Sequence, residues 1–158
     1  MASIDVNDLQ RLFEMRVPLE VLAVQLATQR GSSGHWNEMA HLLASAAVLP
    51  DSAEDALMEI DHACHALFWQ AADNRFLEEQ LTVLYALSLR MWHYSLPRLE
   101  NLRFCVLEHH AMLDAVCQLQ AGLAGQLMEQ HIRAFQENIE QAIRNKWVAP
   151  HFEMEPSP

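Results

Sequence analysis

The sequence has few basic residues and no long uninterrupted apolar run. It contains one lysine, Lys146, and its 10 basic and 21 acidic residues give a formal charge of −11 with histidine neutral. Gripping a phosphate backbone requires clustered basic side chains, so we expect no direct nucleic-acid binding by this chain. No apolar run is long enough for a membrane span, and the N-terminus lacks the basic and apolar regions of a signal peptide.

Glycine and cysteine are also scarce, with four and three residues. Runs of β-branched and aromatic residues, which mark strands, are nearly absent. Cys64, Cys105 and Cys117 are odd in number and widely spaced, and they form no C-x-x-C pair. We interpret them as free thiols in a reducing compartment, which predicts a cytoplasmic protein.

Good helix formers dominate instead, chiefly leucine, alanine, glutamine, glutamate and methionine. The length fits one domain, predicted over 1–150, with 151–158 as a frayed tail. Apolar residues at helical spacing, interrupted by glycine, proline and Asp73-Asn74, predict an all-α antiparallel bundle. Its helices are expected over about 5–30, 33–48, 52–72, 75–95, 97–119 and 123–147.

Three of the nine histidines, with one aspartate, have positions that suggest a shared site. Asp61 and His65 are four residues apart on one predicted helix, which places both side chains on the same face. His109 lies 11 residues before the predicted break at 120, and His131 lies 11 residues after it. In an antiparallel hairpin, such positions stand at the same height, so the two imidazoles can face each other.

One carboxylate and three imidazoles suit a divalent transition metal. Zn²⁺ fits this set best, and Ni²⁺, Co²⁺ and Mn²⁺ are also compatible with Asp61, His65, His109 and His131. Open coordination positions on such an ion can take water or a carboxylate. The alternative is that hydrogen bonds alone satisfy these histidines, and the other histidines are interpreted as ordinary polar residues.

The sequence resembles the FadR-type C-terminal ligand-binding domain, called FCD, of GntR-family bacterial transcription regulators. The family has Asp-x-x-Phe-His where this chain has Asp61 to His65, then a small-Gly-Asn turn where it has 72–74. A Glu-His motif matches Glu108 and His109, and a Met-x-x-His motif ends at His131. The opening Leu-Tyr-x-x-Arg-x-x-Leu-Glu matches 12–20, so the resemblance covers about residues 8 to 146.

The resemblance implies six or seven antiparallel helices around a central cavity in which a metal helps to bind a small organic acid. It also implies a homodimer whose attached winged-helix domains bind DNA. Two departures stand out, because Cys64 replaces the family's Phe and Gln120 replaces an Asp in the last turn. As a third departure, we expect no winged-helix domain in this chain. We therefore expect an excised or stand-alone sensing domain.

Two arginines are candidates for the effector's carboxylate. Arg16 lies in the family's opening motif within an apolar stretch, and Arg90 follows several leucines on the helix predicted over 75–95. Arginine binds carboxylates through two hydrogen bonds, although either residue could instead form a salt bridge or lie at the surface. Trp69, Trp92 and Tyr85 could line the cavity, but core packing is the simpler expectation.

Two other functional classes remain open, and the first is a metalloenzyme with either two metal ions or one. A di-iron enzyme needs two Glu-x-x-His motifs, and the chain has one, from Glu59 to His62, out of step with the other ligands. A mononuclear metalloenzyme needs a general base beside the metal, and Glu108 is expected about 100° around the helix from His109. The second class is a metal-free oligomerisation or interaction module with no cavity.

Overall fold

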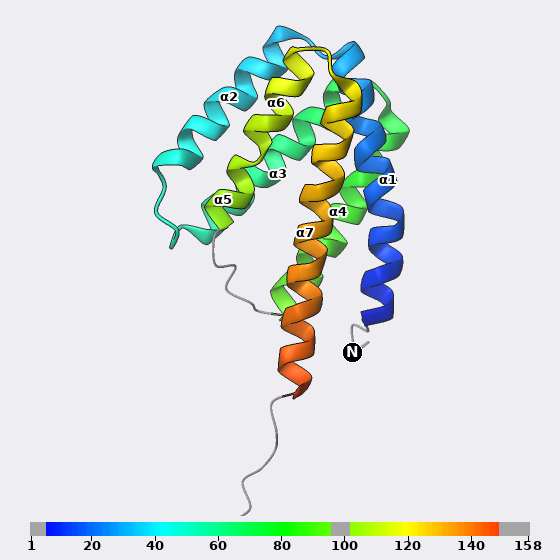
Figure 1. The fold of residues 1–158 in the computed structure, drawn as a ribbon, viewed down its shortest axis with the longest axis vertical. Coiled ribbons are helices and arrows are strands. Elements are labelled where there is room, and N and C mark those ends of the chain that lie inside the picture. The colour runs from blue at the N-terminus through cyan, green and yellow to red at the C-terminus, as the bar shows by residue number, and fades with distance from the viewer. Residues whose placement is uncertain (1–5, 96–101, 149–158) are drawn as a thin grey trace, which may run out of the picture.

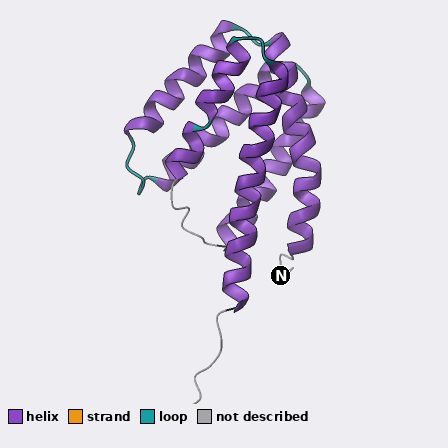
Figure 2. Ribbon diagram, viewed as in Figure 1, coloured by secondary structure: helices purple, strands orange, loops and turns teal. Residues whose placement is uncertain are grey.

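The computed structural model describes residues 6–95 and 102–148, and these residues form helices with no strand (Figures 1 and 2). The predicted start near Pro97 and the predicted tail lie outside the described residues. The helices are α1 (Val6–Arg30), α2 (Ser33–Val48), α3 (Glu54–Ala71), α4 (Arg75–Ser95), α5 (Leu102–Leu107), α6 (His109–Cys117) and α7 (Ala121–Val148).

The helix ends follow from local side-chain and backbone chemistry. Asp73 has a positive φ of 46°, and the Asn74 side chain accepts the backbone N–H of Leu77 at 3.3 Å, which caps the start of α4. Leu119 has a φ of 59°, and the N–H of Gln120 reaches back to the Ala115 carbonyl at 2.9 Å. This pattern closes the C-terminus of α6 and turns the chain into α7.

One predicted helix is in fact two. The sequence predicts a continuous helix up to 119, but it is broken at Glu108 into α5 and α6. Nδ1 of His109 lies 2.9 Å from the carbonyl oxygen of Val106 and competes for an acceptor that a regular helix would use. The N–H of Ala111 bonds to the Glu108 carbonyl in a tighter turn. The break therefore accompanies a specific contact made by a proposed metal ligand.

The long helices α1 and α7 pack along each other, and α3 and α4 pack against α1 (Figure 1). A large apolar cluster joins all seven helices, and a smaller one lies between α1, α3 and α4. Pro18 is exposed and does not end α1.

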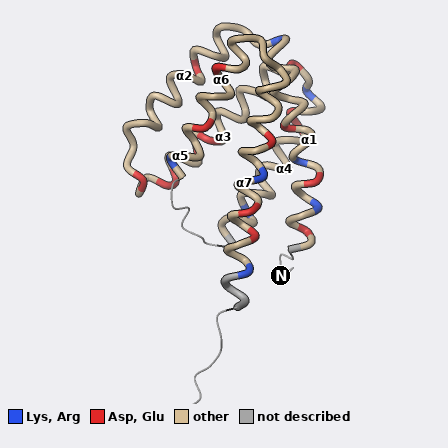
Figure 3. The backbone as a smooth tube through the Cα atoms, in the orientation of Figure 1, with Lys and Arg blue, Asp and Glu red and all other residues tan. Residues whose placement is uncertain are grey.

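Charged positions of both signs are interspersed along α1 and α7 (Figure 3). Opposite charges four residues apart form exposed ion pairs on α7, such as Glu129 with Arg133 at 2.8 Å. None of the helices, over the residues described, has the length and apolarity needed to cross a membrane.

Candidate metal centre

Four side chains from three helices converge on one point inside the bundle. Asp61 and His65 come from α3, His109 begins α6, and His131 lies in the middle of α7. Each residue offers one ligand atom, and these atoms all lie within 4.8 Å of one another. The structure thus brings together all four residues that the sequence nominated as ligands.

The three imidazoles are fixed by hydrogen bonds at the ring nitrogen Nδ1. His65 Nδ1 lies 3.2 Å from Glu20 Oε2, and His131 Nδ1 lies 2.8 Å from Glu108 Oε2. His109 Nδ1 has the Val106 carbonyl as its acceptor. An acceptor at Nδ1 holds the proton there and leaves Nε2 with a free lone pair, which is how metal-binding histidines are usually oriented.

The other ring nitrogen, Nε2, lacks a hydrogen-bond partner in two of these histidines. Nε2 of His65 and Nε2 of His109 are buried and have no hydrogen-bond partner. Asp61 offers no hydrogen bond to His65 or His131, because its oxygens lie 3.8 Å and 3.7 Å from their Nε2 atoms. Two orphaned lone pairs in the core are costly, and a metal ion would satisfy both. The residues therefore fit a metal better than the hydrogen-bonded alternative.

The protonation states also suit coordination. Burial, reinforced by the neighbouring His131 and His65, lowers the pKa of His109 to about 3, so this imidazole is neutral at neutral pH. Burial alone would raise the pKa of Asp61, but the three imidazoles and the Tyr85 hydroxyl outweigh it and lower the pKa to about 2. An ionised carboxylate beside a neutral imidazole is the state that a metal requires.

Glu20 connects the metal centre to a buried arginine. Its carboxylate is fully buried and is bonded to Arg16 Nε at 3.2 Å, to the Trp69 indole N–H at 2.7 Å and to His65. Burial would raise the pKa of Glu20, but His65, Arg16 and Trp69 together lower it to about 2. Glu20 is thus an anion that positions a metal ligand and balances the charge of Arg16.

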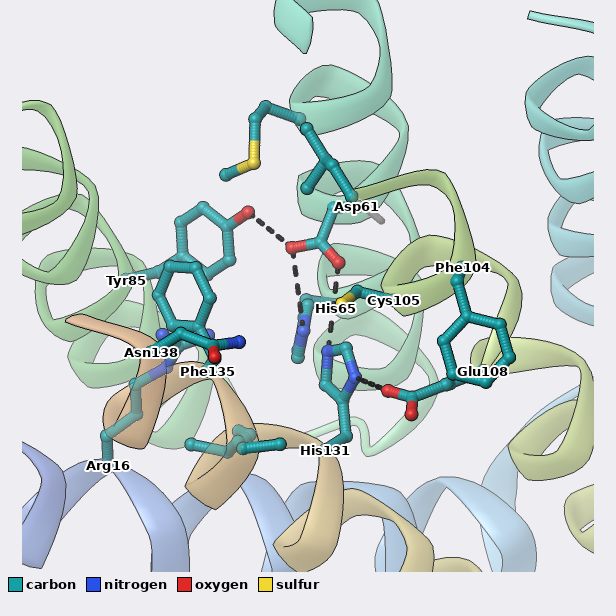
Figure 4. A pocket seen from close by; sticks show the side chains of 14 residues that line it. Arg16, Asp61, His65, Tyr85, Phe104, Cys105, Glu108, His131, Phe135 and Asn138 are labelled. Atoms are coloured by element: carbon teal, nitrogen blue, oxygen red, sulfur yellow. Dashed lines mark hydrogen bonds and ion pairs between the residues drawn. The ribbon is translucent and has the colours of Figure 1, made fainter. Parts of the chain in front are cut away.

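A cavity of about 280 Å³ opens beside the ligands (Figure 4). Asp61, His65 and His131 border it, and Arg16 lies across it with its guanidinium 4.7 Å from the centre of the Tyr85 ring. The Tyr85 hydroxyl donates to Asp61 Oδ2 at 2.8 Å. The remaining walls come from α3, α5, the break between α5 and α6, and α7: Met58, Leu102, Phe104, Cys105, Glu108, Ile132, Ala134, Phe135 and Asn138.

The second predicted effector arginine does not reach this cavity. Arg90 is exposed on α4 and is absent from the cavity lining, because it projects from the side of the helix opposite to the buried Leu81 and Tyr85. Trp69 and Trp92 are buried in the core, as expected, and Tyr85 is a cavity residue as well. Of the two arginines, only Arg16 borders the cavity next to Asp61, His65 and His131.

Three supporting interactions were not predicted from the sequence, those of Glu20 with His65, Glu108 with His131 and Tyr85 with Asp61. Glu20 belongs to the opening motif, and its acidic side chain within an apolar stretch of sequence could have indicated a buried functional carboxylate. Glu108 was placed off to one side of His109, but the helix break redirects it to His131. The Tyr85 hydroxyl could be assigned only from the packing of α4 against α3.

Comparison with known proteins agrees with this architecture. The family model described as the FCD domain matches residues 11–134. The chain belongs to the FCD domain family. Among solved structures, E. coli McbR/YncC resembles it with a TM-score of 0.72 at 16% sequence identity, covering 92% of this chain and 69% of that one.

The resemblance inferred from the motifs is therefore confirmed, together with the all-α fold. At this level of identity the solved structure supports the fold of the FCD chain and carries no residue-level information about its site. The curated proteins compared contain no match.

Proposed function

We propose that this FCD domain is a metal-dependent sensor of a small organic acid in a GntR-type regulator. The two buried Nε2 atoms of His65 and His109 that have no hydrogen-bond partner carry the proposal. Asp61, His65, His109 and His131 would hold one divalent transition metal, with Zn²⁺ the best fit to their chemistry. When bound, the metal would supply a Lewis acid to which an effector's carboxylate can bind.

The cavity supports an acidic effector of modest size. Its volume of about 280 Å³ is small for a ligand pocket, and Arg16 and the metal ligands border the same space. Arg16 is held over Tyr85 and against Glu20, so its guanidinium is already oriented before a ligand arrives. A preorganised cation loses little conformational entropy on binding, which favours a carboxylate that bridges Arg16 and the metal.

Metal content tests the proposal directly. Elemental mass spectrometry should find about one transition metal per untagged wild-type chain and none in the His109→Ala/His131→Ala double variant. His110→Ala is the matched control, because His110 is the exposed neighbour of His109. In Glu108→Gln, metal affinity measured by chelator competition should fall by roughly 10- to 100-fold, since a carboxylate that orients a ligand is lost.

The effector is tested by thermal shift with a panel of di- and tricarboxylates and sugar acids. An effector at about 100 times its Kd should stabilise the metal-loaded domain by about 2.7 kcal/mol, and chelation should abolish most of that gain. Wild-type protein that takes up no metal after soaking and dialysis would refute the metal-dependent mechanism. Metal binding with no stabilisation by any acid would refute the organic-acid effector alone.

A further inference from the structure

The cavity beside the candidate metal ligands extends along one face of α7. His131, Ala134 and Asn138 all line it, and each lies three or four residues from the next. Such positions share one face of a helix, and the seven residues from His131 to Asn138 span about 10 Å. Ala134 adds only a methyl group between the two polar side chains. The cavity therefore has an inner end at His131 and an outer end at Asn138, which is exposed at the surface.

Arg16 lies at the inner end of this cavity. Helices α1 and α7 run in opposite directions (Figure 1), and the ring centres of Phe13 and Phe135 lie 6.4 Å apart. Arg16 follows Phe13 by three residues, so it is level with residues 131–132 of α7. Its Nε donates to Glu20, which leaves the two Nη nitrogens as donors for a ligand. Over the residues described, Arg16 is the one lysine or arginine in the cavity lining.

Away from Arg16 and the metal ligands, the described lining has no group that would neutralise a second carboxylate. In the view of Figure 4, the carboxylate of Glu108 stands on one side of His131, where it would repel another anion. Asn138 stands on the other side and forms no hydrogen bond or ion pair with another described residue. Its amide both donates and accepts, so it can bond to a hydroxyl or carbonyl group. A carboxylate placed there would lose hydration without gaining a cation.

We propose that the effector is a monocarboxylic acid whose tail ends in a neutral hydroxyl or carbonyl group, and that Asn138 selects this tail. The inference rests on the proposed function, because the single carboxylate would bridge Arg16 and the metal at the inner end. The tail would then run along α7 past Ala134 to Asn138. Specificity of this kind combines attraction of the correct group with rejection of the wrong one. Asn138 supplies the attraction, and Glu108 closes the opposite direction to a second anion.

Calorimetric titration of zinc-loaded protein tests the charge of the tail. Two pairs of probes share a carbon chain and differ only at its end: γ-hydroxybutyrate with succinate, and ε-hydroxycaproate with adipate. In each pair that binds, the hydroxy acid should bind about tenfold or more tightly than the diacid, since the second carboxylate of the diacid gains no cation. Equal affinities, or a preference for the diacid, would overturn the inference.

Asn138→Lys tests the assigned residue, because it places a cation at the outer end. This variant should bind the diacids about tenfold more tightly than wild type does and should reverse the preference within each pair. Gln126→Lys is the matched control, since it makes the same change at an exposed position of α7 about 18 Å along the helix from Asn138. The control should keep the preference of wild type. A preference that Asn138→Lys leaves unchanged would overturn the role of Asn138.

The outcomes separate this inference from the proposed function. Stabilisation by a di- or tricarboxylate, with no binding of either hydroxy acid, would overturn the neutral tail and leave the organic-acid sensor standing. Zinc-loaded protein that binds no acid would overturn the acidic effector and the monocarboxylate together. Protein that takes up no zinc would remove the metal-dependent mechanism and, with it, the bridging carboxylate.

Discussion

Replacing Glu20 with glutamine is expected to destabilise the metal-free domain severely. The change preserves the volume of the side chain, removes its charge and replaces one acceptor oxygen with an NH2 donor. Arg16 and His65, two of its three partners, are 3% and 1% exposed, so water cannot take over the lost interaction. The folded state would then contain a buried guanidinium with no compensating anion within contact distance.

The magnitude follows from that burial. Removing one partner of a buried ion pair costs about 3–5 kcal/mol, because the remaining charge keeps its desolvation penalty. For a chain of 158 residues, this corresponds to a fall in Tm of roughly 6–20 °C. Glutamine still accepts the Trp69 indole N–H, so we attribute the loss to charge and not to packing.

Urea unfolding of chelator-treated protein, followed by circular dichroism, provides the assay. The transition midpoint should fall with an unchanged m-value, which identifies a change in stability and not in the unfolded state. Glu129→Gln is the matched control, because Glu129 and Arg133 form an ion pair of the same spacing with side chains 45% and 56% exposed. An exposed pair is worth less than about 1 kcal/mol, so this variant should hardly change.

A second substitution separates the charge effect from other losses. Adding Arg16→Met to Glu20→Gln removes the unpaired cation and should recover most of the lost stability. A loss of less than about 1 kcal/mol in Glu20→Gln, or no recovery in the double variant, would show that Arg16 is not stabilised mainly by the Glu20 carboxylate.

Two further predictions concern other parts of the fold. Gly31→Ala should lower the free energy of unfolding in urea by about 1–3 kcal/mol, because the new methyl group would overlap the Trp36 ring and the Ala27 carbonyl. Gly122→Ala is the control and should be neutral or slightly stabilising, because no atom lies within 4 Å of its new methyl group. Equal effects of the two substitutions would contradict the packing at Gly31. Metal-free protein should lose stability as the pH falls from 6.5 towards 3, since the unfolded chain protonates His109 before the folded chain does. The slope should be shallower in His109→Gln, and an identical slope would contradict the lowered pKa.

The fold and the convergence of the four candidate ligands were largely predictable because they depend on periodic patterns. The four-residue spacing of Asp61 and His65 survives in any regular helix, and the equal distances of His109 and His131 from the turn place them at one height. The break at 120 was predicted correctly, since α6 ends at Cys117 and α7 begins at Ala121. These inferences need only helix geometry and one turn.

The supporting residues were less predictable because they depend on how helices pack. The contact from Glu20 to His65 joins α1 to α3 across 45 positions of sequence, and no local pattern sets that distance. The break at Glu108 arises from the side chain of His109 competing for a backbone acceptor, which periodicity cannot reveal. Arg90 does not line the cavity, and its leucine-rich neighbours in the sequence could not show which side of α4 faces the cavity.

The spread of the four ligands along the chain has a consequence for how the site is filled. Successive ligands from His65 to His109 and His131 are separated by 44 and 22 residues, so an unfolded chain would have to close two long loops to hold a metal. The folded core has already brought them together, so metal uptake should follow folding and not guide it. His131 is the last of the four candidate ligands to be synthesised, so a growing chain lacks the complete ligand set until α7 docks. A metal that needs all four ligands would therefore bind only to the finished domain.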